Sequence, residues 1–483
     1  MSKPARNADD AYDPKFFRRT GHRLVDLLAD YLAAARERRL PVLPEPDPRA
    51  LAPRYQAAAP AGPAARAEDT FLKRVEELIA ESTHLHHPGY IAHQVAPPLP
   101  VGALADLLQG VLNQSLAVYE MSPAATHIER QTVRWLCALV SWDQDSDGVF
   151  TSGGSLGNLT GLLAARNQAT NGAAWERGVG AGPRLAILAC ENAHYSVARA
   201  AGILGLGQKG VVRVPVDARY AMDFGALEKA YVRAVADGHQ VVAVVASAAS
   251  TATGSFDPLR RIGEFCRERG VWLHVDGAHG ASVLFSEKYR HLADGLELAD
   301  SIVWDAHKLL YLPSLATAVL FRRREASYAA FQQHASYLFD RHNEPDMDLA
   351  RRTVECTKRM MAWKLWIAWQ LYGTSGLGEL VTRALDLGCA FAAILRAQPD
   401  FELLTEPMAN ILCFRYRPAG VTPEALNELQ TRVRRQVLES GEFFLVQTRL
   451  GDAVYLRTTL MNVHTTEDDL RRLLDLIRGL AAS

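Results

Sequence analysis

The sequence predicts an α/β fold with a mostly parallel central sheet, followed by a smaller α+β part. The first observation is a series of short apolar runs, rich in β-branched residues, each bounded by polar residues or glycine. The second is that helical patterns, notably residues 223–237 and 257–269, lie between several of these runs. Apolar strands that alternate with helices are typical of a parallel sheet covered on both faces. The strands are expected at residues 184–190, 211–216, 240–248, 271–276, 300–304 and 317–321.

The part that precedes this sheet, residues 1–82, is predicted to be a helical segment. Apolar residues recur at helical spacing over residues 16–39, and a second helix is expected at about residues 69–82. Residues 41–66 are rich in proline and alanine. Because repeated prolines remove backbone donors and block helix formation, we expect these residues to form an extended connector.

The pattern changes after a helical stretch near residues 355–371. Short strands and two longer helices follow, which predicts a small α+β domain. We therefore divide the chain into an N-terminal helical segment (1–82), a large α/β domain (83–371) and a small α+β domain (372–483). In the small domain, strands are expected at 410–416, 443–448 and 453–459, and helices near 422–439 and 465–480.

The composition excludes several classes of protein. The 483 residues include 53 Lys and Arg against 54 Asp and Glu, so a generally basic coat protein is excluded and we expect no nucleic-acid partner. No stretch approaches about 18 uncharged apolar residues, so we expect no membrane span, and the N-terminus lacks the apolar core of a secretory signal. None of the six cysteines stands at CxxC spacing, which fits a cytoplasmic protein with reduced thiols.

A glycine-rich turn precedes an apolar helical run at residues 151–159, with the sequence TSGGSLGNL. Glycine lets the backbone approach a ligand closely, and the N-terminus of a helix presents unpaired N–H groups to an anion. Gly154 and Ser155 would then hold a phosphate group. The motif by itself leaves open a simpler interpretation, in which the turn only caps the helix.

Three further residues follow apolar strands at the expected carboxyl edge of the sheet, where ligands bind in such folds. Asp276 ends the run HVD, and its carboxylate would hold a ring nitrogen protonated or cap the next helix. Lys308, in DAHK, would form a Schiff base or extend to solvent. His194 would stack on a planar ring, assist proton transfer or serve a structural role. An anion site, a carboxylate and a reactive lysine at successive strand ends are what pyridoxal phosphate requires.

The sequence resembles the group II pyridoxal-phosphate-dependent amino-acid decarboxylases, which include the aromatic-amino-acid, glutamate and 2,4-diaminobutyrate decarboxylases. The similarity extends from about residue 15 to the end of the chain. It implies fold type I of the pyridoxal-phosphate enzymes, which is the aspartate-aminotransferase fold. It also implies a homodimer with active sites at the interface, in which the N-terminal helical segment wraps the partner. The motifs that carry the resemblance are HHPGYIAHQ (86–94), TSGGSLGNL (151–159), NAHYSVARAAGILG (192–205), STATGSFDP (250–258), HVDGAHG (274–280), DAHK (305–308), RTVECTKR (352–359) and LRTTLMN (456–462).

The resemblance also implies the roles of individual residues. Lys308 would form the internal aldimine with pyridoxal phosphate, Asp276 would pair with the pyridine nitrogen, and His194 would stack on the ring. Arg457 would pair with the α-carboxylate of the substrate, a task that suits a guanidinium fork. The cofactor-binding set implied in this way is Gly154, Ser155, His194, Ser250, Thr251, Asp276, Ala278, His307 and Lys308, and the substrate-binding set is Arg457, His93 and Tyr90.

The implied activity is the α-decarboxylation of an L-amino acid to an amine and carbon dioxide, through a quinonoid that Asp276 stabilises.

One feature of the sequence departs from the family pattern. Its members usually carry a tyrosine on the loop before the RTVECTKR segment, and here no tyrosine stands at residues 338–349, after Tyr337. The alternative is therefore a decarboxylation-dependent oxidative deaminase, which forms an aldehyde, or another enzyme that diverts the quinonoid. In a plain decarboxylase, His342 or a histidine of the partner chain would replace the tyrosine as proton donor.

No metal site is expected. Four histidines, His84, His86, His87 and His93, lie close together in the sequence, but no acidic residues stand beside them at ligand spacing. The identity of the amino-acid substrate is left open, because the residues that would select it lie on loops.

Overall fold

The computed structural model describes residues 11–45, 47–331 and 347–482. By their internal contacts the residues form two compact units. The large unit contains residues 94–397 and 403–413, and the small unit contains residues 1–93, 398–402 and 414–483. The three-part division with boundaries after residues 82 and 371 stays a prediction. Within the described ranges, every helix is too short or too polar to cross a bilayer.

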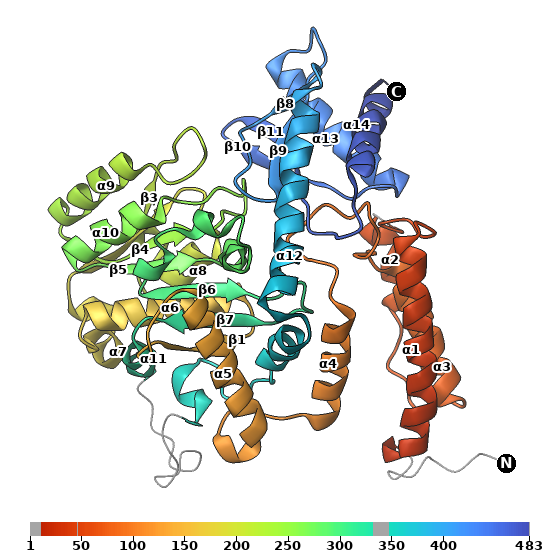
Figure 1. Ribbon diagram of the computed structural model, residues 1–483, viewed down its shortest axis with the longest axis horizontal. Helices are drawn as coiled ribbons and strands as arrows, with labels where there is room; N and C mark the ends of the chain where they lie inside the picture. The colour runs from red at the N-terminus through yellow and green to blue at the C-terminus, as the bar shows by residue number, and fades with distance from the viewer. Residues whose placement is uncertain (1–10, 46, 332–346, 483) are drawn as a thin grey trace. The chain divides into compact units, whose positions relative to one another are not determined.

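The large unit is built on a seven-stranded sheet in the order β1-β7-β6-β5-β4-β2-β3 (Figure 1). Neighbouring strands are parallel from β3 to β6, whereas β7 is antiparallel to both of its neighbours. The central strands are buried along nearly their whole length, which explains their mostly apolar sequences. The mostly parallel sheet predicted from the sequence is therefore confirmed. The strands are β1 (Asp147–Thr151), β2 (Arg184–Cys190), β3 (Val211–Val214), β4 (His239–Ser247), β5 (Trp272–Asp276), β6 (Ser301–Asp305) and β7 (Thr317–Phe321).

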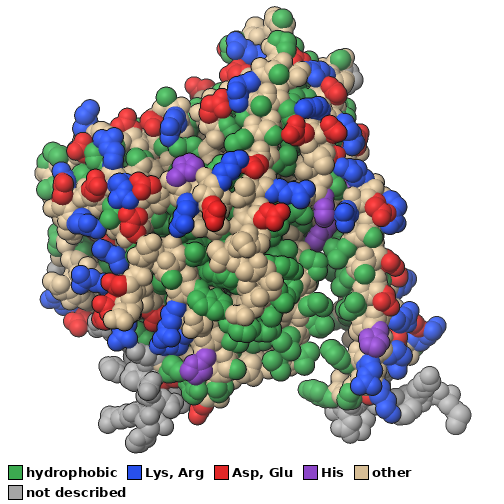
Figure 2. All heavy atoms as spheres, viewed as in Figure 1, with side chains coloured by type: hydrophobic (Ala, Val, Ile, Leu, Met, Phe, Trp, Pro, Cys, Tyr) green, Lys and Arg blue, Asp and Glu red, His purple; other side chains and the backbone are tan. Residues whose placement is uncertain are grey.

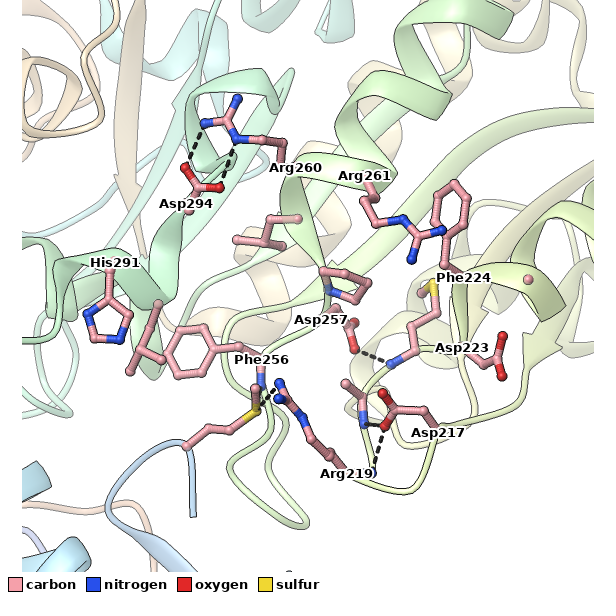
Figure 3. A pocket seen from close by; sticks show the side chains of 17 residues that line it. Asp217, Arg219, Asp223, Phe224, Phe256, Asp257, Arg260, Arg261, His291 and Asp294 are labelled. Atoms are coloured by element: carbon pink, nitrogen blue, oxygen red, sulfur yellow. Dashed lines mark hydrogen bonds and ion pairs between the residues drawn. The ribbon is translucent and has the colours of Figure 1, made fainter. Parts of the chain in front are cut away.

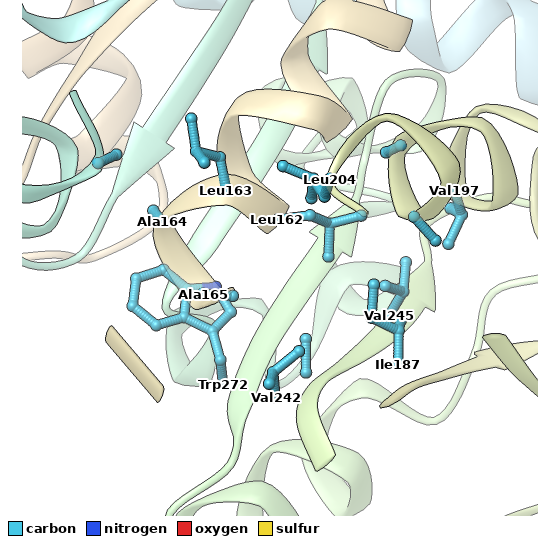
Figure 4. Close-up of a cluster of buried hydrophobic side chains, with 14 of the residues drawn as sticks. Leu162, Leu163, Ala164, Ala165, Ile187, Val197, Leu204, Val242, Val245 and Trp272 are labelled. Atoms are coloured by element: carbon cyan, nitrogen blue, oxygen red, sulfur yellow. The ribbon is translucent and has the colours of Figure 1, made fainter. Parts of the chain in front are cut away.

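Helices cover this sheet, and α6 (Gly154–Ala169) is the most deeply buried part of that cover. The other helices of the large unit are α4 (Pro100–Leu112), α5 (Pro123–Leu139), α7 (Ala173–Arg177), α8 (Ser196–Ile203), α9 (Phe224–Ala236), α10 (Leu259–Arg269), α11 (Arg324–Ala330) and α12 (Ala362–Arg396). Helix α6 packs on strands β4 to β7 and between α8 and α11. Its buried residues are distributed over every face, as expected for a helix with neighbours all round, and they include the polar side chains of Asn158, Thr160, Arg166 and Asn167. Figure 4 shows Leu162 and Leu163 of α6 packed among Val197, Val245 and Trp272.

Two glycines let α6 approach the sheet closely. A Cβ atom built on Gly161 would lie 2.5 Å from Cε1 of His274, and one on Gly157 would lie 3.0 Å from Cγ2 of Val303. A side chain at Gly161 would therefore push the helix away from β5.

We expect Gly161→Ala to lower the free energy of unfolding by about 1–3 kcal/mol, because the added methyl overpacks a buried interface. Urea titration measures this change. Gly202→Ala is the matched control in α8: a Cβ there meets nothing within 4 Å. Since alanine restricts the unfolded chain more than glycine does, this control should raise the same quantity by about 0.5–1 kcal/mol. Equal effects of the two substitutions would contradict the close approach described here.

The small unit combines the N-terminal helices with most of a C-terminal sheet of order β10-β11-β9-β8, of which residue 403 in β8 and residues 411–413 in β9 are counted with the large unit. Strands β10 and β11 pair antiparallel, and the predicted small α+β arrangement is confirmed. The strands are β8 (Phe401–Leu403), β9 (Ile411–Tyr416), β10 (Val446–Leu450) and β11 (Ala453–Thr459). The helices are α1 (Pro14–Arg36), α2 (Pro48–Tyr55), α3 (Ala67–Glu81), α13 (Pro423–Ser440) and α14 (Glu467–Ala482).

Two expectations about helices need correction. Residues 41–66 are not extended throughout, because they include α2. Its first residue is Pro48, at a position where the missing N–H costs nothing, and Asp47 caps the helix by accepting the N–H of Arg49 at 2.9 Å. The helix expected near residues 355–371 begins only at Ala362. Helix α12 is interrupted close to the expected end, at Gly373 with φ 65°, and a second helical stretch then continues to Arg396.

Candidate active site

A cavity of about 300 Å³ opens at the carboxyl edge of the large sheet, and we call it the sheet-edge cavity. Its walls include Ser247, Asp276 and Asp305, which are the last residues of β4, β5 and β6. All the predicted cofactor-binding residues line this one cavity: Gly154, Ser155, His194, Ser250, Thr251, Asp276, Ala278, His307 and Lys308. Segments that are far apart in the sequence thus bring the candidate residues together, as a ligand site in a doubly wound sheet requires.

The glycine-rich turn forms one wall of the sheet-edge cavity. Gly153 has φ +103°, a conformation that favours glycine, and α6 begins at the next residue. The first N–H groups of a helix have no acceptor within the helix, so those of Gly154 and Ser155 are available to an anion. A Cβ on Gly154 would lie 3.2 Å from Oδ2 of Asp305, so a side chain would fill this cradle. The turn therefore fits a phosphate group.

Asp276 lies on the floor of the sheet-edge cavity, where its register opposite Ser247 places it at the sheet edge. Its Oδ2 accepts a hydrogen bond from Nδ2 of Asn158 at 2.9 Å, and its Oδ1 accepts one from the N–H of Ala278 at 3.2 Å. These bonds fix the carboxylate and leave lone pairs that face the cavity. A carboxylate held in this way is suited to pair with a protonated ring nitrogen.

Lys308 contributes an amine to the same cavity. Its Nζ lies 3.2 Å from Oδ2 of Asp305, and its side chain is only 18% exposed, so it is not an extended surface lysine. Oδ1 of Asp305 accepts a hydrogen bond from the hydroxyl of Thr317 at 2.5 Å. His307 Nε2 lies 3.6 Å from Oδ2 of Asp305, and burial lowers the pKa of His307. Asp305 thus orients the amine that would bond to a cofactor aldehyde.

His194 is held by the residues that follow β2. Its Nδ1 lies 2.7 Å from Oγ of Ser196. Burial lowers the pKa of His194, Lys308 lowers it further, and Asp276 opposes them. The imidazole is therefore neutral near pH 7 and lines the cavity as a planar ring that carries one proton.

The loop after β4 forms a further wall, and hydroxyl groups organise it. Ser250 Oγ lies 2.9 Å from Oγ1 of Thr253, which lies 2.9 Å from Oγ of Ser255. Asp257 anchors the loop because its carboxylate accepts the N–H groups of Ser247 and Met222, both at 2.7 Å. These contacts present Ser250 and its neighbour Thr251 to the cavity.

The predicted substrate-binding residues lie in the small unit. The rings of Tyr90 and His93 both pack edge-on against Phe444, with centroid separations of 5.6 and 5.7 Å. Arg457 is buried. The burial of His93 lowers the pKa of that histidine, and the positive charge of Arg457 lowers it further. Nη2 of Arg457 lies 3.4 Å from Oγ1 of Thr459. The three predicted residues are thus close to one another, and their role toward a substrate stays a prediction.

The loop without the family tyrosine lies largely outside the described residues. Tyr337 and His342 both fall in that part, so the expectations that concern them are untested. Among the described residues, no group of three His, Cys, Asp or Glu side chains is arranged to hold a metal ion.

Sequence reasoning missed several residues of the sheet-edge cavity. Asn158 and Asp305 stand inside quoted motifs but were given no role. Asn158 follows Gly154 by four residues, and residues four apart share one face of a helix, so its position was open to prediction. Ser247 ends β4 as Asp276 ends β5, so the strand-end pattern applies to it as well. The contribution of Leu315 depends on how its loop folds, and the sequence carries no comparable pattern for it.

A second cavity in the large unit is larger, about 580 Å³, and Figure 3 shows its lining. Its carboxylates already have structural partners. Asp294 pairs with Arg260, Asp223 caps α9, and Asp217 accepts backbone N–H groups of its own loop. Burial raises the pKa of Asp257 to about 6. Because no lysine lines this second cavity, its size does not make it the catalytic site.

The groups of the sheet-edge cavity fit pyridoxal phosphate. The glycine cradle and the start of α6 suit the phosphate, Asp276 suits the ring nitrogen, Ala278 and His194 supply flat contacts, and Lys308 supplies the amine.

Comparisons with known proteins agree with this geometry. Residues 48–417 match the family model described as the pyridoxal-dependent decarboxylase conserved domain. The chain is 32% identical over 421 residues to L-2,4-diaminobutyrate decarboxylase of Acinetobacter baumannii, covering 84% of this chain and 82% of the relative. It is 32% identical over 454 residues to aspartate 1-decarboxylase of Aliivibrio fischeri, covering 85% and 82%.

Solved structures show the same fold. The crystal structure of mouse CSAD aligns with a TM-score of 0.90 and 26% identity, over 97% of this chain and 99% of that one. The glutamate decarboxylase domain of a Vibrio parahaemolyticus protein aligns with a TM-score of 0.84 and 27% identity, over 100% and 97%. The chain therefore belongs to the group II pyridoxal-phosphate-dependent amino-acid decarboxylases, which are carboxy-lyases of fold type I with pyridoxal phosphate as cofactor.

Proposed function

We propose that this decarboxylase removes the α-carboxylate of an L-amino acid at the sheet-edge cavity and releases the amine and carbon dioxide. The observation that carries the proposal is the convergence of Lys308, Asp276 and His194 on that cavity. The names of several relatives include aspartate, acidic amino acid and 2,4-diaminobutyrate decarboxylases. We therefore propose a substrate with a short charged side chain.

Pyridoxal phosphate, when bound, supplies the electron sink that lets the bond between Cα and the carboxylate break. The residues of this chain position that chemistry. Lys308 would hold the cofactor covalently through its amine and receive it back after each turnover. Asp276 would keep a proton on the ring nitrogen, and the first turn of α6 with Ser155 would hold the phosphate.

Four further residues would face the cofactor ring or the substrate. His194, neutral because of burial, would pack on the cofactor ring and move a proton at Nε2, since its Nδ1 faces Ser196. Arg457 would pair with the α-carboxylate, and Tyr90 and His93 would line the entrance. The roles of Arg457, Tyr90 and His93 are supported by the family motifs LRTTLMN and HHPGYIAHQ, which contain these residues, and by the closeness of the three residues within the small unit.

A second candidate function is favoured by one observation, the lack of a tyrosine at residues 338–349. A methionine or leucine cannot donate a proton. If no group protonates Cα after carbon dioxide leaves, oxygen would be consumed and the product would be an aldehyde with ammonia and peroxide.

The test is turnover of a panel of L-amino acids by the purified enzyme with pyridoxal phosphate, with and without oxygen, following carbon dioxide, amine, aldehyde and peroxide together. Equal carbon dioxide and amine, independent of oxygen, supports the first function. Carbon dioxide with aldehyde and peroxide supports the second. Aspartate, glutamate and 2,4-diaminobutyrate should react fastest, and faster turnover of an aromatic amino acid would refute the proposed substrate class.

We further propose that the enzyme is a cytoplasmic homodimer. The six cysteines, all within the described residues, form no disulfide, which suits a reducing compartment. Helix α4 exposes an apolar face, and Figure 2 shows hydrophobic side chains gathered over it. An exposed apolar patch of this kind is typical of a protein interface. Its most exposed members are Leu104, Leu107, Leu108, Val111 and Leu112.

We expect Leu107→Glu combined with Val111→Glu to convert the dimer to a monomer, because two buried charges without partners oppose association. Light scattering coupled to size-exclusion chromatography measures the mass. Val232→Glu is the control, because Val232 on α9 is 66% exposed but lies outside this face. An unchanged dimer in the double variant would show that α4 is not at the interface.

A further inference from the structure

A continuous chain of buried polar side chains lies between α6 and the strands below the sheet-edge cavity. Nε1 of Trp272 donates to Oγ of Ser301 at 2.8 Å, and that hydroxyl lies 2.7 Å from Nδ1 of His274. Nε2 of His274 lies 2.9 Å from Oδ1 of Asn158. Ser301, His274 and Asn158 are buried. The chain therefore runs from the core to Asp276, which Asn158 contacts directly.

The direction of each hydrogen bond follows from the groups at its ends. An indole N–H only donates, so the Ser301 hydroxyl accepts from Trp272, and its own proton can go to Nδ1 of His274. Burial lowers the pKa of His274 to about 4, so its ring is neutral and its single proton is on Nε2. That proton needs an acceptor, which is Oδ1 of Asn158. The reverse orientation of the amide would set Oδ1 against the carboxylate of Asp276, where two acceptors would repel.

The amide nitrogen of Asn158 then has two protons to donate. One goes to Oδ2 of Asp276 at 2.9 Å, and the other goes to Oγ of Ser196 at 2.8 Å. Ser196 accepts this bond, and its own proton can go to Nδ1 of His194, 2.7 Å away. The backbone N–H of Ser196 also donates to the same Nδ1 at 3.4 Å. Two donors on Nδ1 leave Nε2 as the protonated nitrogen of a neutral His194.

We propose that Asn158 is a positioning residue that orients both catalytic side chains, holding Asp276 directly and keeping His194 in its Nε2–H tautomer through Ser196. This inference rests on the proposed function, since it gives His194 and Asp276 their roles at the same cavity. One amide thus couples the carboxylate that would keep the ring nitrogen protonated with the imidazole that would pack on the ring and move a proton at Nε2.

The experiment compares Ser196→Ala and Asn158→Leu with wild-type holoenzyme labelled with ¹⁵N-histidine, using His194→Gln to assign the His194 signals. In the wild type, the chemical shifts should report a protonated Nε2. In Ser196→Ala we expect a mixture of tautomers and a fall in kcat of about tenfold or more with little change in KM, because the wrong tautomer cannot deliver its proton. Ser196→Thr keeps a hydroxyl and should restore both.

Asn158→Leu removes both bonds at once, so it should also weaken the binding of pyridoxal phosphate, measured by titration of the apoenzyme. Asn167→Leu is the matched control: Asn167 is buried on the same helix, but its Nδ2 donates to the carbonyl of Ala330, away from the cavity. This control should lower stability without changing the His194 tautomer or kcat.

The proposal is overturned if wild-type His194 carries its proton on Nδ1, or if the tautomer is the same in Ser196→Ala. It is also overturned if Asn167→Leu changes kcat as much as Asn158→Leu does. Failure of the proposed function is distinguishable, because the tautomer is read from the spectrum even if no amino acid is decarboxylated.

Discussion

Lys308→Ala is expected to lower turnover by on the order of a thousandfold or more, because it removes the one amine among the residues that line the sheet-edge cavity. The substitution also leaves Oδ2 of Asp305 without the ammonium that lies 3.2 Å away. Steady-state kinetics on the best substrate of the panel measures the loss. Borohydride reduction of the wild type, followed by peptide mapping, should place the cofactor on the peptide that contains Lys308.

Lys308→Arg separates the reactivity of the amine from the positive charge of the side chain. Lys308→Arg keeps a cation beside Asp305, but a guanidinium stays protonated and does not attack an aldehyde. It should therefore be as inactive as Lys308→Ala while recovering any stability lost through the unpaired carboxylate. Lys288→Ala, at an exposed lysine that pairs with Asp386, should keep wild-type turnover. Activity within about threefold of the wild type in Lys308→Ala would refute the covalent role.

Much of the large sheet was predictable because its strands are buried on both faces. Residues 184–190 and 317–321 form β2 and β7 with the predicted bounds, since uninterrupted apolar runs between polar residues leave little choice. Strand β1 was missed. Its sequence, DGVFT, contains aspartate and glycine, which are poor strand formers, and it forms only by pairing along the antiparallel strand β7. Pairing between segments this far apart in the sequence leaves no local pattern.

The residues of the candidate site also divide into those that the sequence pattern predicts and those that only the folded structure reveals. Residues at strand ends, such as Asp276 and Lys308, were found because the carboxyl edge of a parallel sheet is where ligands bind. Asn158 was missed as a functional residue because its partners lie far along the chain, in β5 and at the start of α8. The sequence states which side chains are available, but the contacts of a buried amide are set by how closely α6 packs on the sheet. Gly157 and Gly161 permit that packing.

Asp276→Asn is the second substitution with a large expected effect. The amide has almost the same shape and keeps an oxygen for the N–H of Ala278, but it carries no negative charge. A ring nitrogen opposite a neutral amide loses the partner that keeps it protonated, so the electron sink weakens. Removing one preorganised electrostatic partner of a developing charge costs about 10²–10³ in kcat, and we expect a loss of that size with a smaller change in KM.

The absorbance of the bound cofactor offers a second measurement, because the protonation of the ring changes its spectrum without any turnover. Asp276→Glu keeps the charge but moves it by one methylene, so it should recover part of kcat if charge is the main contribution. Asp223→Asn is the control, since Asp223 caps α9 and asparagine caps a helix equally well. Asp276→Asn with an unchanged spectrum and kcat within about threefold of the wild type would mean that another group keeps the ring protonated.

Among the residues that line the sheet-edge cavity, Asp305 is the other carboxylate, and its two oxygens already contact Lys308 and Thr317. A large loss is therefore the expected result, because the cavity holds no second carboxylate that is free to replace Asp276.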